Sequence, residues 1–172
     1  MLKTLGILCI LSGSTGFGLL CARELELRIT ELQQLQQTML LLQGGIRYMH
    51  QPLPEAFLHL SESAPDPFRK FFLCIAQDLR GSSGQTAEEI WQRNIKRYLL
   101  GLHISGQERK DLEMLGSMLG YLDVQMQVNA LDYYLKQLEL SLQQALEASK
   151  SRRKLYQYMG MLGGAALVIL IF

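Results

Sequence analysis

The sequence predicts an all-α protein: a six-helix up-and-down bundle flanked by N- and C-terminal transmembrane helices. Apolar residues recur at helical spacing in every long segment, and no segment shows the alternation that is typical of strands. Apart from Lys3, every charged residue lies between Arg23 and Lys154, so both ends of the 172-residue chain are uncharged and apolar. These observations exclude an ordinary soluble monomer as the default expectation.

The first apolar segment, 4–22, is long enough for a membrane anchor. As a helix with a rise of roughly 1.5 Å per residue, it would span about 28 Å, close to the hydrocarbon thickness of a bilayer. A cleaved signal peptide would show a similar charged start and apolar run. The segment ends with Leu20-Cys21-Ala22-Arg23, however, and has no A-x-A-like cleavage site. We therefore expect a retained anchor.

The second apolar segment, 155–172, follows a cluster of basic residues at Lys150 and 152–154. Gly160 and Gly164 are four residues apart, a spacing that lets another membrane helix approach closely, so we predict membrane packing at these glycines. Basic residues gather on the middle domain's side of both anchors. By the positive-inside rule, the middle domain, 23–154, is expected to be cytoplasmic.

The first half of the middle domain predicts three helices. One continues the N-terminal anchor over 23–43 and is expected to stop at Gly44-Gly45. The second covers about 53–63, with a proline in its first turn. Asp66 is expected to cap the third helix, which ends near Gly81.

The second half predicts three more helices. The spacings Thr86-x-x-Glu89 and Ser105-x-x-Glu108 match the capping box, in which two side chains satisfy free backbone N–H groups. The helices that they start extend to about Leu99 and to the Gly120 region. The sixth helix carries a heptad stripe and is expected to continue into the second anchor, so that the chain returns to its starting side. The stripe consists of Val124, Val128, Leu131, Leu135, Leu138, Leu142 and Ala145.

Few residues suggest catalytic or metal chemistry. Glu55, His59 and Glu62 share one helical face, but a metal site needs a denser cluster. The Gly-Ser-Ser-Gly segment at 81–84 lacks the lysine of a phosphate-binding loop and does not follow a strand. The near-balanced charge argues against a nucleic-acid partner. We therefore expect no enzyme activity, no cofactor or metal, and no small-molecule substrate.

The three cysteines, Cys9, Cys21 and Cys74, do not form the paired framework of a secreted domain. Two lie in the first anchor, and Cys74 is surrounded in sequence by apolar residues. All three are expected to be free thiols, with Cys74 in the core.

The segment 115–127 has features that invite a functional interpretation. Gly116 and Gly120 lie four residues apart inside a helical pattern, where each costs about 1 kcal/mol relative to alanine, so something is expected to pack closely against them. One interpretation is packing within the bundle, with Asp123 capping the sixth helix. The other is a partner-binding surface formed by Gly116, Gly120, Asp123 and Gln127, in which Gln127 is the better contact candidate.

A series of motifs extends over nearly the whole chain. Between the anchors lie Arg23-Glu24-Leu25, Gln51-Pro52-Leu53-Pro54-Glu55-Ala56, Phe68 and Phe72, Ala87 with Trp91, and Leu-Gly-x-x-Leu-Gly-x-x-Asp-x-x-x-Gln at 115–127. In this order the motifs resemble those of the stage III sporulation protein AB family of endospore-forming bacteria. The run at 115–127 is the most specific part of the resemblance.

The resemblance implies a helical domain similar to the cytoplasmic domains of the type II secretion system F protein. It also implies a location in the mother-cell membrane that faces the forespore, within a channel-like complex assembled during engulfment. The implied partners are the cytoplasmic ATPase of that complex, stage III sporulation protein AA, together with other membrane components and the lipid bilayer.

Two functions remain open. In the first, the protein is a non-enzymatic membrane adaptor that docks the ATPase. In the second, it is a small channel or transporter subunit whose transmembrane helices are the working part. A conducting pathway usually places an ionisable residue inside the bilayer, and neither apolar segment contains one. We therefore favour the adaptor.

Overall fold

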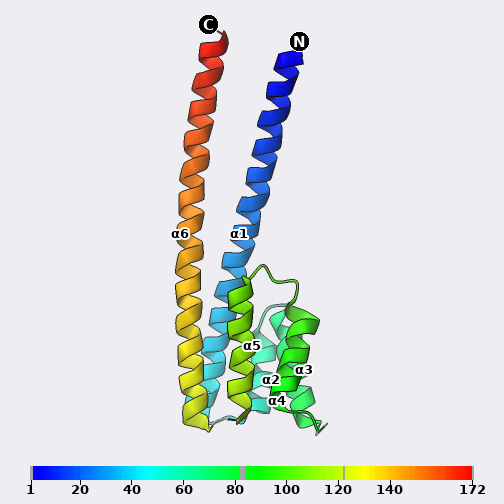
Figure 1. Cartoon of the computed structure of the whole chain (residues 1–172). Helices are drawn as coiled ribbons and strands as arrows, with labels where there is room; N and C mark the ends of the chain where they lie inside the picture. Colours follow the sequence, from blue (N-terminus) through cyan, green and yellow to red (C-terminus); the bar gives the residue numbers. More distant parts are fainter. Residues whose placement is uncertain (1, 82–83, 122, 172) are drawn as a thin grey trace.

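The computed structural model of the chain is helical throughout its described part (Figure 1). It describes the backbone of residues 2–81, 84–121 and 123–171, and side chains within 23–81, 84–120 and 123–151. No strand occurs in these backbone ranges, so the predicted all-α class is confirmed. The elements are α1 (Leu2–Met49), α2 (Leu53–Ser63), α3 (Phe68–Arg80), α4 (Ala87–Asn94), the π-helical segment η1 (Ile95–Leu99), α5 (Gly106–Tyr121) and α6 (Val124–Ile171).

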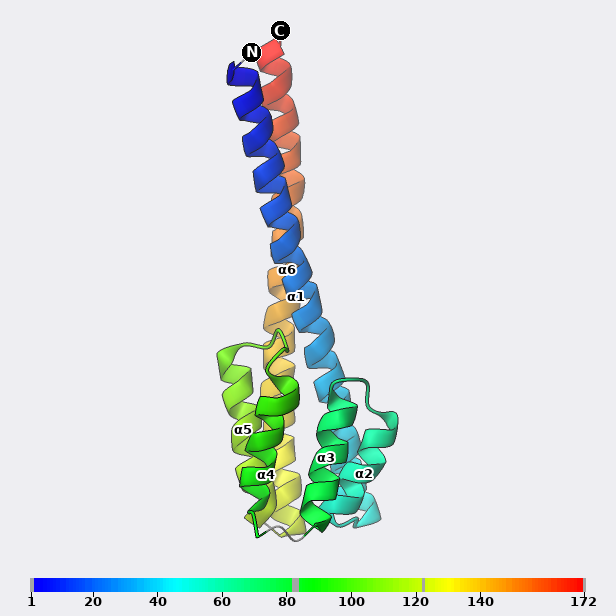
Figure 2. The ribbon, with the colours of Figure 1, turned by 90° about the vertical axis from the view of Figure 1, so that its right-hand side faces the viewer.

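The six α-helices of the described chain form the expected up-and-down bundle. Each helix packs against the next one in the sequence, and α6 returns beside α1 to close the arrangement. Figures 1 and 2 show α1 and α6 extending together beyond the other helices, with the two termini at the same end. We call this end proximal and the opposite end, where α5 turns into α6, distal.

The core is built around aromatic side chains from three helices. Trp91 of α4 makes an edge contact with Phe71 of α3, with ring centroids 5.0 Å apart, and a tilted contact with Phe57 of α2 at 5.8 Å. Each such ring contributes a large apolar area, and edge contacts between rings add about 0.5–1.5 kcal/mol. Leucines of α1 and α6 belong to the same buried cluster, so the paired long helices are part of the bundle and not only of its extension.

Both predicted capping boxes are present. The hydroxyl of Thr86 accepts from the Glu89 N–H at 3.2 Å, and the Glu89 carboxylate accepts from the Thr86 N–H at 3.0 Å. Ser105 and Glu108 exchange the same two bonds at 3.2 and 2.5 Å. The starts of α4 and α5 therefore follow from local side-chain chemistry.

The heptad stripe of α6 is buried as predicted over most of its length. Leu131 and Leu138 are buried completely or nearly so, and Leu135 lies at the edge of the core. Val124 is an exception, because 48% of it is exposed. Gln43 and Arg47 of α1 both contact Asp132 of α6. Since the two helices are antiparallel, α1 has already ended at the level of Val124.

The expected stop at Gly44-Gly45 is wrong, because α1 continues to Met49. Ile46, immediately after the glycines, is 1% exposed, so its burial in the core favours one more helical turn over a break. The chain leaves the helix at His50, which has a φ of 51°, and the Gln51 N–H donates to the Gly45 carbonyl at 3.3 Å. Tertiary packing therefore outweighs the low helix propensity of the glycine pair.

Two other details of the predicted helices need correction. Asp66 does not cap α3; Pro67 occupies the cap position, and the carbonyls of Pro65 and Pro67 accept the first free N–H groups. The Asp66 carboxylate instead lies 3.6 Å from the Lys70 ammonium. The fourth predicted helix changes to a π-helix over Ile95–Leu99, where the side chain of Asn94 donates to the Ile90 carbonyl at 2.9 Å.

Within the part of the chain whose side chains are described, no helix is both long and apolar enough to cross a membrane. The segments 4–22 and 155–172, which the sequence predicts to be anchors, lie outside those residues, as do Gly160 and Gly164. The backbones of α1 and α6 continue as helices into both segments, and α6 has no break, as expected.

Candidate partner-binding surface

Gly116 and Gly120 allow α5 to approach α4 closely. A Cβ atom at Gly116 would lie 2.0 Å from Cδ1 of Trp91, and one at Gly120 would lie 2.7 Å from the Cβ of Ala87. Trp91 also donates its Nε1–H to the Leu112 carbonyl at 2.9 Å. The prediction that something packs tightly against these glycines is therefore confirmed, and the packing element is α4.

Asp123 and Gln127 organise the turn from α5 to α6. The Asp123 carboxylate accepts from the Met126 N–H at 2.8 Å, so Asp123 is the predicted cap of α6. The Gln127 side chain donates to the Leu119 carbonyl at 2.9 Å, which satisfies one of the free carbonyls at the end of α5. The sequence pattern did not predict this second bond, which gives Gln127 an internal partner.

The four predicted partner-binding residues thus come together at the distal end but differ in accessibility. Gly116 is buried beneath Trp91, whereas Gly120 and Asp123 are exposed and Gln127 is half-buried. Partner contact at these residues stays a prediction. Only Gly120, Asp123 and Gln127 are accessible enough to make it directly.

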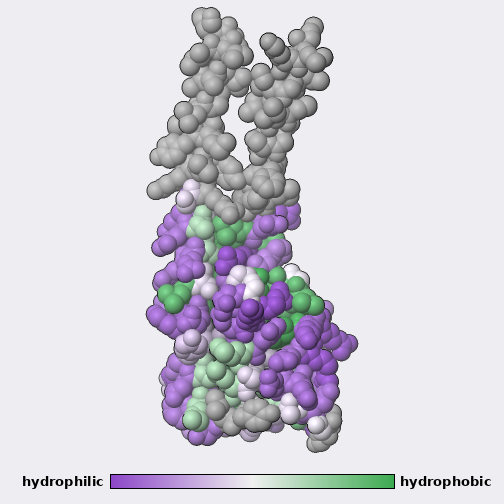
Figure 3. All heavy atoms as spheres, in the orientation of Figure 1, coloured by the Kyte–Doolittle hydropathy of each residue, from purple (hydrophilic) through white to green (hydrophobic). Residues whose placement is uncertain are grey.

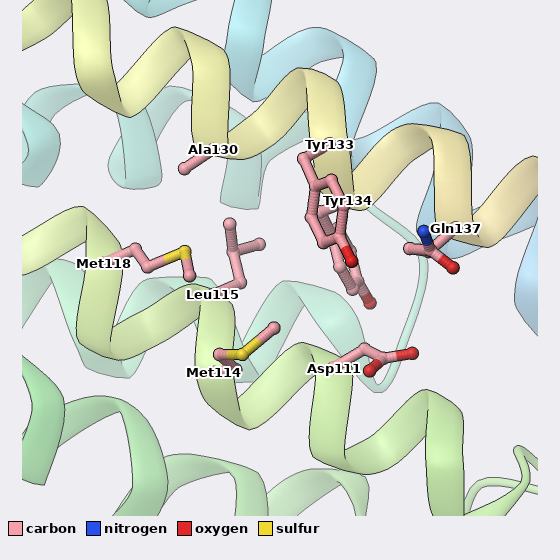
Figure 4. A pocket seen from close by; sticks show the side chains of 8 residues that line it. All are labelled: Asp111, Met114, Leu115, Met118, Ala130, Tyr133, Tyr134 and Gln137. Atoms are coloured by element: carbon pink, nitrogen blue, oxygen red, sulfur yellow. The ribbon is translucent and has the colours of Figure 1, made fainter.

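A shallow groove, with a volume of only about 10 Å³, lies between α5 and α6 (Figure 4). Its rim is formed by the flexible apolar side chains of Met114 and Met118 from α5 and by Tyr133 from α6, which is 56% exposed. Figure 3 shows the corresponding hydrophobic band between more hydrophilic surfaces of the two helices. Methionine and tyrosine are well suited to binding a protein partner, because one adapts its shape and the other combines an apolar ring with a polar tip.

Tyr134 lies at the bottom of the same groove. It is buried, and its hydroxyl has no hydrogen-bond partner among the described side chains and backbone groups. Burial, together with the nearby carboxylates of Asp111 and Glu108, raises the pKa of Tyr134 well above its ordinary value. Tyr134 is therefore a neutral group that remains protonated at physiological pH.

A second and larger groove, of about 360 Å³, lies between α1 and α2. Leu40 and Leu41 of α1 line it, and about half of each side chain is exposed. Tyr48 and Met49 extend it to the distal end, with 76% and 69% of their surfaces exposed. So many large apolar side chains near one groove are unusual for a surface that only faces water.

Near the distal end, the last part of α1 lies beside α6 (Figures 1 and 2). Arg47 of α1 and Asp132 of α6 form an ion pair at 2.6 Å that ties the two helices together there. The neighbouring Tyr48 side chain raises the pKa of Arg47 above its ordinary value, desolvation opposes this, and Asp132 raises the pKa further. We define the distal surface as Tyr48, Met49, Gly120, Asp123, Val124, Met126 and Gln127.

The apolar half of the distal surface was missed by sequence reasoning. Leu40 and Leu41 interrupt the stripe formed by Met39, Leu42 and Ile46, and that irregularity was the available signal. The predicted stop at Gly44-Gly45 leaves Tyr48 and Met49 outside the helix. Their exposure depends on where α2 packs, which helical periodicity does not reveal.

The residues considered for metal or thiol chemistry have the following surroundings in the described part of the chain. No group of three or more His, Cys, Asp or Glu residues among them is arranged to hold a metal ion. Glu55 pairs with Arg80 at 3.1 Å, and His59 contacts Gln51 at 3.1 Å. Cys74 is a free thiol, as expected, but it is half-buried, with its Sγ 3.1 Å from the Tyr98 hydroxyl. Cys9 and Cys21 lie outside the described side chains.

The fold and this surface define a class of all-helical domains whose first and last helices pair and extend beyond the bundle. The model of one family in this class, stage III sporulation protein AB, matches residues 3–172, and the chain belongs to that family. The chain is 27% identical to stage III sporulation protein AB of Bacillus subtilis (strain 168) over 171 residues, which cover 99% of each protein. A solved structure of a stage III sporulation protein AB matches with a TM-score of 0.65 and 25% identity, covering 72% of this chain and 97% of that one.

Proposed function

We propose that this sporulation protein is a non-enzymatic, membrane-anchored adaptor of the mother cell–forespore channel complex. The segments 4–22 and 155–172 hold it in the membrane, and the domain between them faces the mother-cell cytoplasm. Its partner there is the motor ATPase stage III sporulation protein AA, which docks on the distal surface.

One observation carries this proposal: large apolar side chains are exposed at the end of the bundle opposite to the one from which α1 and α6 extend. If those helices enter the membrane, the distal surface is the part of the domain that lies farthest from it. A cytoplasmic partner can approach this end without meeting the bilayer. The exposed Tyr and Met side chains resemble those at the centre of a protein interface, where such residues contribute most to affinity.

The proposal is tested by measuring the affinity of the purified full-length protein for the ATPase after Tyr48→Ser and Met126→Ser are combined. Both side chains are more than half exposed, so the double substitution should leave the melting temperature almost unchanged. Losing two central apolar contacts should raise Kd at least about tenfold. Leu140→Ser, on an exposed part of α6 away from the distal surface, is the matched control and should bind like the parent. An unaltered Kd in the double variant would refute docking at this surface.

Gln127→Ala addresses the polar part of the distal surface. Because Gln127 holds the Leu119 carbonyl, its loss should lower stability by about 0.5–1.5 kcal/mol. We expect a reduced affinity for the ATPase at a temperature where the variant remains folded. Parent-like binding combined with a lower melting temperature would assign Gln127 to the turn alone and remove it from the interface.

A further inference from the structure

The α4–α5 connection is located at the end of the bundle that faces the anchors. In Figures 1 and 2 it rises beside α1 on the side from which α1 and α6 extend. The Glu31 carboxylate of α1 accepts from the His103 backbone N–H at 2.5 Å and contacts its ring Nδ1 at 3.0 Å. Arg28 of α1 pairs with Glu108 at 2.6 Å. These contacts fix the connection at the level of residues 28–31.

Its distance from a membrane follows from the helix rise. Nine residues separate Glu31 from Ala22, the last residue of the predicted anchor, which corresponds to about 13 Å along α1. The headgroup layer occupies about 5–8 Å of this distance. The remaining gap of about 5–8 Å does not exceed the Debye length of about 8 Å at physiological ionic strength. Side chains of the connection can therefore interact electrostatically with the membrane surface, and long ones can reach it.

Four basic side chains lie in or next to the connection. Lys96 and Lys110 are exposed and make no ion pair with any described carboxylate. Arg97 lies over the Tyr98 ring at 5.3 Å. Arg109 donates to the carbonyls of Leu99, Leu100 and Leu102. We call the set Lys96, Arg97, Leu100, Gly101, Arg109 and Lys110 the proximal basic loop.

Several carboxylates near this loop are already engaged. Asp78, whose charge interacts with that of Arg97, is paired with Arg93 at 2.7 Å. Glu108 is buried and paired with Arg28, and Glu31 is held by His103. Asp111 accepts from the Gln107 side chain at 2.8 Å. The positive charges of the loop are thus not neutralised by direct ion pairs, and they surround Leu100, whose side chain is 61% exposed. Basic residues around an exposed apolar side chain favour contact with an anionic lipid surface.

We infer that the proximal basic loop binds anionic lipid headgroups, so that the domain touches the membrane at a third place besides its two anchors. This inference rests on the membrane anchoring in the proposed function, and it is independent of ATPase docking. The contact limits how far the bundle can tilt about α1 and α6. It thereby keeps the distal surface directed away from the bilayer.

The test places a polarity-sensitive fluorophore at Gly101→Cys in the full-length chain, with Cys9, Cys21 and Cys74 replaced by serine. A Cβ at Gly101 has nothing within 4 Å, so the label fits without distortion. The chain is reconstituted in vesicles of phosphatidylcholine alone and in vesicles that also contain phosphatidylglycerol. The emission should move to shorter wavelength only with phosphatidylglycerol, and added salt should reverse the change. The same fluorophore at Gln125→Cys, at the distal end, should respond to neither lipid.

Lys96→Gln combined with Lys110→Gln tests the charges directly. Each lysine near an anionic surface strengthens attraction by about fivefold, so the double variant should lose most of the phosphatidylglycerol response. Lys136→Gln removes one charge on α6, away from the proximal basic loop, and this variant should retain the phosphatidylglycerol response. An equal emission in both vesicle types, or an undiminished response in the double variant, would overturn the inference.

Flotation in high salt separates this result from the question of anchoring. If the chain floats with the vesicles but the emission of its label at position 101 does not change with phosphatidylglycerol, only the loop contact is overturned. A chain that is washed off the vesicles overturns the anchors, and with them the membrane part of the proposed function.

Discussion

Gly116 and Gly44 both lie inside helices, but only Gly44 has room for a side chain. At Gly116 the Trp91 ring occupies the space that a Cβ atom would need. At Gly44 a Cβ atom would have nothing within 4 Å. The first glycine is required by packing, whereas the second only weakens the helix.

Gly116→Ala should therefore destabilise the domain. The added methyl forces Trp91 out of its position and endangers its hydrogen bond to Leu112, so a loss of about 1–3 kcal/mol or more is expected. Thermal unfolding of the purified protein, followed by far-ultraviolet circular dichroism, measures the effect. A parent-like melting temperature would mean that α4 and α5 can separate at this position without cost.

Gly44→Ala should have the opposite effect. It removes backbone freedom from the unfolded chain and improves helix propensity, which together should raise the free energy of unfolding by about 0.5–1 kcal/mol. The same unfolding measurement applies, with Gly116→Ala run in parallel. A decrease in the free energy of unfolding would contradict this prediction and show that the added methyl group is not tolerated at Gly44.

At the scale of elements, Glu108 joins the start of α5 to α1. Burial raises the pKa of Glu108, but the hydrogen bonds from Arg28 and from the Ser105 N–H outweigh burial, so the pKa lies below its ordinary value. The unfolded chain thus binds the proton more readily than the folded one. The contribution of ionised Glu108 to the free energy of unfolding is therefore complete above the pKa of the unfolded chain, about 4.3. It is lost as pH falls through the lower pKa of the folded protein.

Urea unfolding over a pH series should show this directly. The free energy of unfolding should fall in the parent as pH decreases below about 4.5, and Glu108→Gln should remove part of that slope. Glu147→Gln, at an exposed position of α6, serves as the control and should keep the parental slope. Identical slopes in the parent and Glu108→Gln would show that Glu108 does not couple folding to protonation.

The α6 stripe also permits a test at this scale. Leu135→Asp places a carboxylate at the edge of the core, at a cost of several kcal/mol if it stays charged, and should unfold the domain at ordinary temperatures. Leu140→Asp makes the same change at an exposed position of α6 and should be tolerated. Similar melting temperatures for the two variants would contradict the burial of the stripe.

Elements that depend on local chemistry could be predicted closely from the sequence, whereas those that depend on packing could not. The capping boxes and the proline-started α2 are examples of the first kind, since their interactions lie within a few residues. The end of α1 is of the second kind, because the burial of Ile46 decides it. In the candidate site, the Asp123 cap was predictable in the same local way. The Gln127–Leu119 bond and the exposure of Tyr48 were not, since both require the positions of neighbouring helices.

For the whole molecule, the charge distribution predicts a cytoplasmic domain. A cysteine introduced at the exposed Glu62 should not react with a membrane-impermeant thiol reagent in intact cells, and should react after lysis. The parent chain, with its native cysteines, provides the background signal. Labelling above that background without lysis would reverse the topology and exclude docking of a cytoplasmic ATPase.

The pairing of α1 with α6 makes the molecule stiff along its long axis. Both helices have one end at the distal surface, where α1 stops at Met49 and α6 starts at Val124, and each continues for 48 residues without a loop. At roughly 1.5 Å per residue, each forms a strut about 72 Å long. A sideways force on the distal surface therefore acts through a long, stiff lever. Because no loop interrupts either helix, a rotation of the bundle is transmitted to the far ends of α1 and α6 together.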